Sequence, residues 1–126
     1  MEVRALLGGE VITVAPAATL REAAVRMVDP DIGSVAVMNG PKVVGILTER
    51  DLVHAIAAGA DVDDASVERW MTASPDVIAP VDDVEDAADW MLATGHRHLP
   101  VMEGETLLGI VSIKDVLWAL RDGVRS

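Results

Sequence analysis

Cysteine is absent from this sequence of 126 residues, and so are phenylalanine and tyrosine. Without cysteine the chain has no disulfide framework, no thiolate metal site and no cysteine nucleophile. Three tryptophans are its only large aromatic residues, although hydrophobic residues make up 51% of the chain. The interior must therefore be built from valine, isoleucine, leucine, alanine and methionine. A chain of this length can form a single core of that kind without covalent staples.

Long apolar runs and a basic surplus are also missing. No apolar run approaches the ~18–20 residues that a membrane span requires, and the N-terminus lacks the layout of a signal peptide. We therefore predict a cytoplasmic protein without a membrane segment. The net charge of −11 argues against nucleic-acid binding through a basic face, because such a surface repels the phosphate backbone. Small anionic ligands are compatible with this charge wherever a few cations are held together.

The dominant feature that is present is a motif that occurs twice, 64 residues apart. The first copy is GILTERD at 45–51 and the second is GIVSIKD at 109–115. Each has a glycine, a short apolar run, a hydroxyl residue, two spacers of which the second is basic, and an aspartate. Pro16 and Pro80 match at the same offset, as do Met27 and Met91. Because a repeat fixes the architecture, we predict an α+β fold with the order β-α-β-β-α twice.

Turn residues and strand patterns set the bounds of each repeat. We predict an N-terminal arm at 1–10, a first repeat at 11–59, a linker at 60–74, a second repeat at 75–123 and a C-terminal tail at 124–126. The expected strands are 11–14, 34–38 and 43–47 in the first repeat, and 77–78, 99–102 and 107–111 in the second.

Four longer helices are predicted from capping residues and apolar stripes. They begin at Thr19, whose capping box includes Glu22, at Thr48, at Asp83 and at Ser112. Pro30 is expected to end the first helix, Gly59 the second and Gly123 the last, and Ser66 to cap a short helical turn at 67–71. The expected buried stripes are Leu20, Ala23, Ala24 and Met27; Leu52, Val53 and Ile56; Val84, Ala87, Ala88 and Met91; and Val116, Leu117 and Leu120.

Each motif admits two interpretations. Thr48 and Ser112 lie at strand-to-helix junctions, where a hydroxyl and an aspartate in the first turn stabilise a helix start. Gly45 and Gly109 lie inside strands, which indicates the close approach of another backbone or of a ligand. An aspartate at a helix start is also a good acceptor for a ribose diol, and a nearby cation with free amides would hold phosphate. The motifs are therefore helix caps, ligand sites or both.

The first motif and the segment RHLPV at 97–101 resemble the signature segments of the CBS (cystathionine β-synthase) domain. The resemblance covers nearly the whole chain, as a tandem pair or Bateman module. It implies two β-α-β-β-α repeats packed about a pseudo-two-fold axis, with two clefts between them. The implied ligands are adenosine compounds, namely AMP, ADP, ATP, S-adenosylmethionine or NAD, acting as regulatory ligands and not as a required cofactor.

The resemblance also assigns residues to the two clefts. The motif aspartate would take the ribose hydroxyls, the hydroxyl residue would lie near ribose or phosphate, and one residue of the opposite repeat would lie at the cleft edge. The residues so assigned are Asp115, Ser112, Lys114 and Thr13 for one cleft, and Asp51, Thr48, Arg50 and Val77 for the other. Arg97 and His98 match a basic pair that could reach phosphate, whereas the first repeat has Gly33 and Ser34 there. The clefts are therefore expected to be chemically unequal.

His96 and His98 have a spacing that can hold a metal, but no thiolate or acidic third ligand accompanies them, so no metal site is predicted. No nucleophile–base pair has a supporting motif, and we predict no enzyme activity.

Trp90 and Trp118 lie off the expected buried stripes. Exposed tryptophan is typical of an interface, and the resemblance favours a homodimer, with partial burial against the N-terminal arm as the alternative.

These features together predict a regulatory module that senses an adenine nucleotide and signals the bound state to a protein target that the sequence does not identify. The alternative is a ligand-free scaffold or protein-interaction module, in which both motifs only cap helices.

Overall fold

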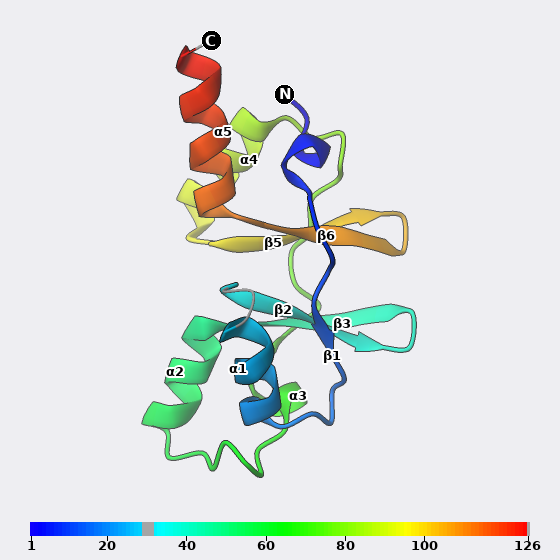
Figure 1. Cartoon of the computed structure of the whole chain (residues 1–126), viewed down its shortest axis with the longest axis vertical. Helices are drawn as coiled ribbons and strands as arrows, with labels where there is room; N and C mark the ends of the chain where they lie inside the picture. Colours follow the sequence, from blue (N-terminus) through cyan, green and yellow to red (C-terminus); the bar gives the residue numbers. More distant parts are fainter. Residues whose placement is uncertain (29–31, 126) are drawn as a thin grey trace. The chain divides into compact units, whose positions relative to one another are not determined.

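The structure is a computed structural model that describes residues 1–28 and 32–125 (Figure 1). It has the predicted α+β composition and separates into two compact units, one of Val11–Pro75 and one of Met1–Glu10 with Asp76–Ser126. Each unit has its own hydrophobic cluster, so the single core expected from the chain length is divided in two. Within the described residues, no helix combines the length and the apolar character needed to cross a membrane.

The unit of residues 11–75 contains a four-stranded sheet with the order β1-β2-β3-β4. Strands β2 (Ser34–Asn39) and β3 (Lys42–Thr48) form an antiparallel hairpin, β1 (Thr13–Val14) pairs in parallel with β2, and β4 (Thr72–Ala73) pairs antiparallel with β3. Helices α1 (Leu20–Val28) and α2 (Glu49–Ala57) lie on one face of this sheet (Figure 1). Pro30, which was expected to end α1, lies outside the described residues. Strand β4 was not predicted and lies within the expected linker.

In the other unit, β5 (His98–Glu103) and β6 (Thr106–Ser112) form an antiparallel hairpin beside α4 (Val84–Thr94) and α5 (Ile113–Arg125). The strand expected at 77–78 is reduced to a parallel bridge between Ile78 and Val101. Asp83 caps α4 as predicted, because its carboxylate accepts a hydrogen bond from the backbone N–H of Glu85 (3.1 Å). Helix α5 passes through Gly123 and ends two residues later than expected.

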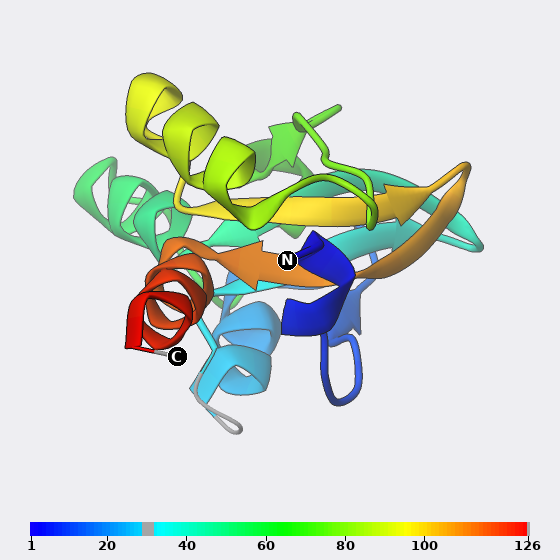
Figure 2. The same ribbon diagram turned by 90° about the horizontal axis from the view of Figure 1, so that it is seen from above.

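The first residues of the chain are an integral part of the second repeat. The short 3-10 helix η1 (Val3–Leu6) and helix α3 (Val67–Trp70) are 64 residues apart and make equivalent contacts, each in its own unit. The matching backbone bonds are Val3 N to Asp82 O (2.8 Å) and Val84 N to Met1 O (2.9 Å), and Val67 N to Ala18 O (2.8 Å) and Leu20 N to Ala65 O (3.0 Å). Val3 and Val67 are both fully buried, and Figure 2 shows η1 beside β6. The segment that precedes each repeat thus completes the core of the other repeat.

The predicted buried stripes are confirmed on α1 and α4, where every position is buried except the half-buried Ala24. On α2 the prediction is wrong for Val53 and Ile56, which are each 63% exposed. The buried residue of α2 is instead Ala55, with Leu52 half-buried beside it. The inward face of α2 therefore lies about one residue away from the predicted one.

Helix α5 departs from the prediction in the same way. Val116 is fully buried and Leu120 half-buried, but Leu117 is 56% exposed. Both helices carry two adjoining apolar stripes, and helical periodicity does not identify which stripe faces the sheet. The second stripe remains on the surface in both units.

The short helix α3 begins after Ser66, as expected, but the Ser66 side chain makes no capping hydrogen bond. The helix start is held by the backbone instead, through the bond from Val67 N to Ala18 O. This explains why a hydroxyl is not required there.

Candidate functional site

Thr48 and Asp51 form a capping box at the start of α2. The N–H of Thr48 donates to Oδ2 of Asp51 (2.8 Å), its hydroxyl donates to the same oxygen (3.1 Å), and the N–H of Asp51 donates to Oγ1 of Thr48 (3.3 Å). The interpretation of the first motif as a helix cap is therefore confirmed. Among the described residues, Oδ1 of Asp51 accepts no hydrogen bond. The half-buried carboxylate keeps one oxygen for another donor.

Ser112 and Asp115 repeat this arrangement at the start of α5. The N–H of Ser112 donates to Oδ2 of Asp115 (3.0 Å), and the N–H of Asp115 donates to Oγ of Ser112 (3.1 Å). Again Oδ1 of the aspartate accepts no hydrogen bond from the residues that the structure describes. Asp115 is exposed, whereas Asp51 is half-buried. Capping and ligand binding can therefore coexist, since they would use different oxygens of one carboxylate.

One backbone hydrogen bond brings a further position next to each motif. The N–H of Ile113 donates to the carbonyl of Arg97 (2.8 Å), and the equivalent N–H of Glu49 donates to the carbonyl of Gly33 (3.0 Å). Across the β5–β6 hairpin, His98 pairs in register with Ser112. The structure therefore gathers Arg97 and His98 at the second motif, within one unit.

The basic side chains near the motifs are available to a ligand. Arg50, Arg97 and Lys114 are exposed, and within residues 1–28 and 32–125 none of the three forms an ion pair. His98 is half-buried. A guanidinium or ammonium group that has no carboxylate partner is suited to hold phosphate.

The motif glycines are explained by packing inside each unit. A Cβ atom on Gly45 would lie 2.5 Å from Sδ of Met71 and 2.8 Å from the carbonyl oxygen of Thr72. A Cβ atom on Gly109 would lie 2.8 Å from Cδ2 of Leu7. The predicted close approach is thus present, and it comes from the segments that lead out of α3 and η1. No ligand is needed to account for these glycines.

Thr13 and Val77 are placed at the beginning of their repeats. Thr13 lies in β1 and pairs with Ala36 of β2, and Val77 precedes the bridge residue Ile78 and is 44% exposed. Each belongs to the unit opposite to the motif with which the resemblance groups it. Their contribution to the two clefts stays a prediction.

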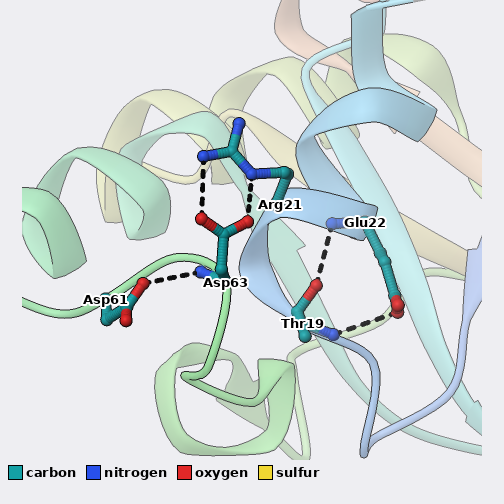
Figure 3. A network of polar contacts seen from close by, with 5 residues as sticks. All are labelled: Thr19, Arg21, Glu22, Asp61 and Asp63. Carbon is teal, nitrogen blue, oxygen red and sulfur yellow. Dashed lines mark hydrogen bonds and ion pairs between the residues drawn. The ribbon is translucent and has the colours of Figure 1, made fainter.

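A polar network on the first repeat was missed in the sequence (Figure 3). The guanidinium of Arg21 on α1 forms a bidentate ion pair with Asp63, in which Nε donates to Oδ1 and Nη2 donates to Oδ2. The hydrogen bond from Arg21 holds the pKa of Asp63 below its ordinary value. Beside it, Thr19 and Glu22 form the predicted capping box, with both bonds at 3.1 Å. These residues line a groove along α1 that Thr13 also borders. No local spacing indicates the ion pair, because 42 residues separate its members.

His96 is already engaged within its unit. Its Nε2 lies 2.8 Å from Oδ2 of Asp76, and its ring meets the ring of Trp90 edge-on, with 5.8 Å between centroids. In the part of the chain that the structure describes, no three metal-ligating side chains gather. Among the described residues, no third metal-ligating side chain therefore lies close to both His96 and His98.

The two tryptophans singled out in the sequence have different environments. Trp90 is half-buried and packs against the hydrophobic cluster of its unit. Trp118 is 51% exposed, and the guanidinium of Arg121 lies 5.1 Å from its ring centroid. Trp118 and the neighbouring Leu117 form an exposed apolar surface on α5.

A protein-family model described as the CBS domain matches the chain twice, at residues 3–58 and 65–122. The chain belongs to the CBS-domain family. The two CBS matches begin ahead of the predicted repeat starts at residues 11 and 75, and they take in η1 and α3. The equivalence of these two segments in the structure therefore has a counterpart in the family model.

Relatives and solved structures support the same assignment. An uncharacterized 17.7 kDa protein of Acidianus ambivalens is 43% identical over 115 residues, which are 90% of this chain and 69% of that protein. Two further curated relatives are longer than this chain, which spans 57% of the length of one and 32% of the length of the other. A CBS-domain containing protein from Agrobacterium tumefaciens has a TM-score of 0.88 at 37% identity, over 95% of this chain and 99% of that one. A CBS domain protein from Pyrobaculum aerophilum, complexed with AMP, has a TM-score of 0.85 at 25% identity, over 97% and 99% of the two chains.

Proposed function

We propose that this CBS pair is a regulatory module that binds an adenine nucleotide or a related adenosyl ligand and signals the bound state to a protein partner. The observation that carries the proposal is the pair of capping boxes. In each, one oxygen of the motif aspartate closes the helix start and the other has no donor among the described residues. A carboxylate oxygen free at a helix start can accept both hydroxyls of a ribose.

Each motif lies at a helix start and has at least one exposed cation near it. The N-terminus of α2 and that of α5 favour a negative charge, and exposed cations lie beside them at Arg50, Lys114 and Arg97. The AMP complex of the Pyrobaculum aerophilum protein supports the same ligand class for a chain of similar fold and sequence. Thr13 and Val77 would border the adenosine, and His98 would assist with phosphate.

Signalling requires that the ligand bind two conformations of the module unequally, since a ligand shifts only equilibria in which its affinities differ. The role is binding and not catalysis, with the nucleotide as a regulatory ligand. The alternative function is a ligand-free scaffold, which the confirmed capping boxes equally permit. A measurement of binding separates the two.

Thermal unfolding with AMP, ADP, ATP, NAD or S-adenosylmethionine tests the proposal. A ligand at 100 times its dissociation constant is expected to stabilise the chain by about 2.7 kcal/mol, which raises the melting temperature by several degrees. Asp51→Asn and Asp115→Asn should each remove one site, weakening binding there by roughly 10- to 100-fold, because a charge-assisted hydrogen bond contributes about 1.5–3 kcal/mol. An asparagine oxygen can still accept the capping bond, so folding is retained.

Asp83→Asn is the matched control, since Asp83 also caps a helix but belongs to neither motif. It should leave the ligand-induced shift unchanged. If none of the five ligands raises the melting temperature of the wild-type chain, the module is a scaffold and the sensing proposal is wrong.

We also propose that the module forms a homodimer through its exposed helix faces. Leu117 and Trp118 on α5 and Val53 and Ile56 on α2 are each at least half exposed, and apolar side chains gathered on helix faces are typical of protein interfaces. Leu117 and Val53 are equivalent positions of the two repeats, so the same feature occurs in both units. Trp90 contributes less, because it is occupied by its own core and by His96.

Trp118→Glu is expected to shift the dimer towards monomer. A buried tryptophan at an interface commonly contributes 2 kcal/mol or more, which corresponds to roughly a 30-fold increase in the dissociation constant. Sedimentation equilibrium over a range of protein concentrations measures the change, with Thr106→Glu at the exposed first residue of β6 as the control. A wild-type chain that stays monomeric throughout the range would contradict the proposal.

A further inference from the structure

The two motifs differ in charge at one place in the fold that the structure makes directly comparable. In each repeat, the residue that follows the motif hydroxyl donates its N–H to the carbonyl of the residue that precedes the central strand. In the first repeat these two residues are Glu49 and Gly33, and in the second they are Ile113 and Arg97. The same hydrogen-bonded pair of positions therefore carries a negative charge in one repeat and a positive charge in the other.

The local charge balance of the first motif is negative. Glu49 and Arg50 are exposed and Asp51 is half-buried, so two carboxylates outweigh one guanidinium by a single charge. Glu49 forms no ion pair with any residue that the structure describes. Its charge is uncompensated at the helix start, where a phosphate would otherwise be favoured.

The balance of the second motif is positive. Arg97 and Lys114 together outweigh Asp115 by a single charge, and all three side chains are exposed. At the position of Glu49 this repeat has Ile113, whose side chain packs against the hydrophobic cluster of its unit. Ile113 leaves no negative charge beside the helix start. The half-buried His98 lies beside the motif, in register with Ser112.

We propose that the two motifs divide adenosyl ligands by charge. The second motif takes a ligand with one or more phosphates, and the first takes one whose 5′ substituent is neutral or cationic, such as adenosine or S-adenosylmethionine. Glu49 and Arg97 are the residues that determine this specificity. The inference rests on the proposed function, because it assumes that each motif aspartate holds a ribose.

The expected size of the effect follows from Coulomb's law. Two unit charges about 8 Å apart, between an effective dielectric of 80 and one of 20, change an affinity by roughly 2- to 30-fold. The motifs differ by two charges and a phosphate carries one to two. We therefore expect AMP, relative to adenosine, to favour the second motif by at least about fivefold. Because the charges are exposed, the preference should shrink at about 0.5 M salt.

Calorimetric titration of the full chain with adenosine, AMP and S-adenosylmethionine tests the division. Asp115→Asn leaves the first motif to be titrated alone, and Asp51→Asn leaves the second. In these backgrounds, Glu49→Gln should strengthen AMP binding at the first motif and Arg97→Gln should weaken it at the second, each by roughly 2- to 30-fold. Neither should change adenosine affinity. Glu105→Gln, on the exposed β5–β6 turn, controls for the overall change in net charge.

The outcomes separate the two proposals. If adenosine and AMP bind both motifs with the same relative affinity, or Glu49→Gln changes adenosine and AMP binding equally, the division by charge is wrong and nucleotide sensing stands. If adenosine, AMP and S-adenosylmethionine all fail to bind the wild-type chain, the division by charge is wrong. If ADP, ATP and NAD fail as well, nucleotide sensing is also wrong. A preference of AMP for the second motif that Arg97→Gln removes would support the inference.

Discussion

Val3→Asp is expected to destabilise the second repeat by about 4 kcal/mol or more, although residue 3 lies outside both predicted repeats. Val3 is fully buried in a cluster that includes Val84, Met91 and Val116. The substitution loses the burial of a valine, about 1.5–3 kcal/mol, and places a carboxyl group without a partner in an apolar core. That sum is a large fraction of the ~5–15 kcal/mol that stabilises a typical domain. Urea unfolding of the full chain measures the loss.

Ala5→Asp is the matched control for this prediction. Ala5 lies in the same short helix η1 but is exposed, and surface substitutions usually stay within about 0.5 kcal/mol. A loose N-terminal arm would make the two variants equally harmless. Equal stability of Val3→Asp and Ala5→Asp would therefore contradict the assignment of η1 to the core of the second repeat.

The repeated order of strands and helices could be predicted from the sequence, because the two copies of the motif align the two halves of the chain with each other. The strand predicted at 11–14 has only two residues in the structure, and the one predicted at 77–78 is a single bridge at Ile78, because few residues in these segments pair with a neighbouring strand. The equivalence of η1 and α3 was missed because only Val3 and Val67 are identical in the aligned segments VRALL and VERWM. A four-residue helix is too short for periodicity to identify.

The candidate site was predicted in part. The capping boxes were readable, because Thr48 with Asp51 and Ser112 with Asp115 have the local spacing that such caps require. Nothing in the local sequence shows that Glu49 and Arg97 occupy the two ends of equivalent backbone hydrogen bonds, since that relation depends on the hairpin register. Long-range pairs of this kind emerge only from the fold.

Gly45→Ala is expected to destabilise the first repeat by roughly 2–3 kcal/mol, whereas Gly109→Ala should change the stability of the second by less than about 1 kcal/mol. The new methyl at position 45 would meet the backbone carbonyl of Thr72 at 2.8 Å as well as the side chain of Met71. Strand β4 would have to move away from β3, and overpacking of this kind costs about 1–3 kcal/mol. At position 109 the methyl meets only the end of the Leu7 side chain, which can change rotamer.

Second-site variants test why Gly45→Ala and Gly109→Ala are expected to differ in stability. Leu7→Ala should restore the packing around Gly109→Ala, so that the double mutant is more stable than the sum of the two single changes predicts. Met71→Ala should not restore Gly45→Ala, because the carbonyl of Thr72 would still block the methyl group. Urea unfolding of all six variants measures these couplings. If Met71→Ala does rescue Gly45→Ala, the glycine is required by a side chain and not by the backbone of β4. If both alanine variants keep the stability of the wild-type chain but lose ligand binding, the glycines serve the ligand, and their explanation by packing is wrong.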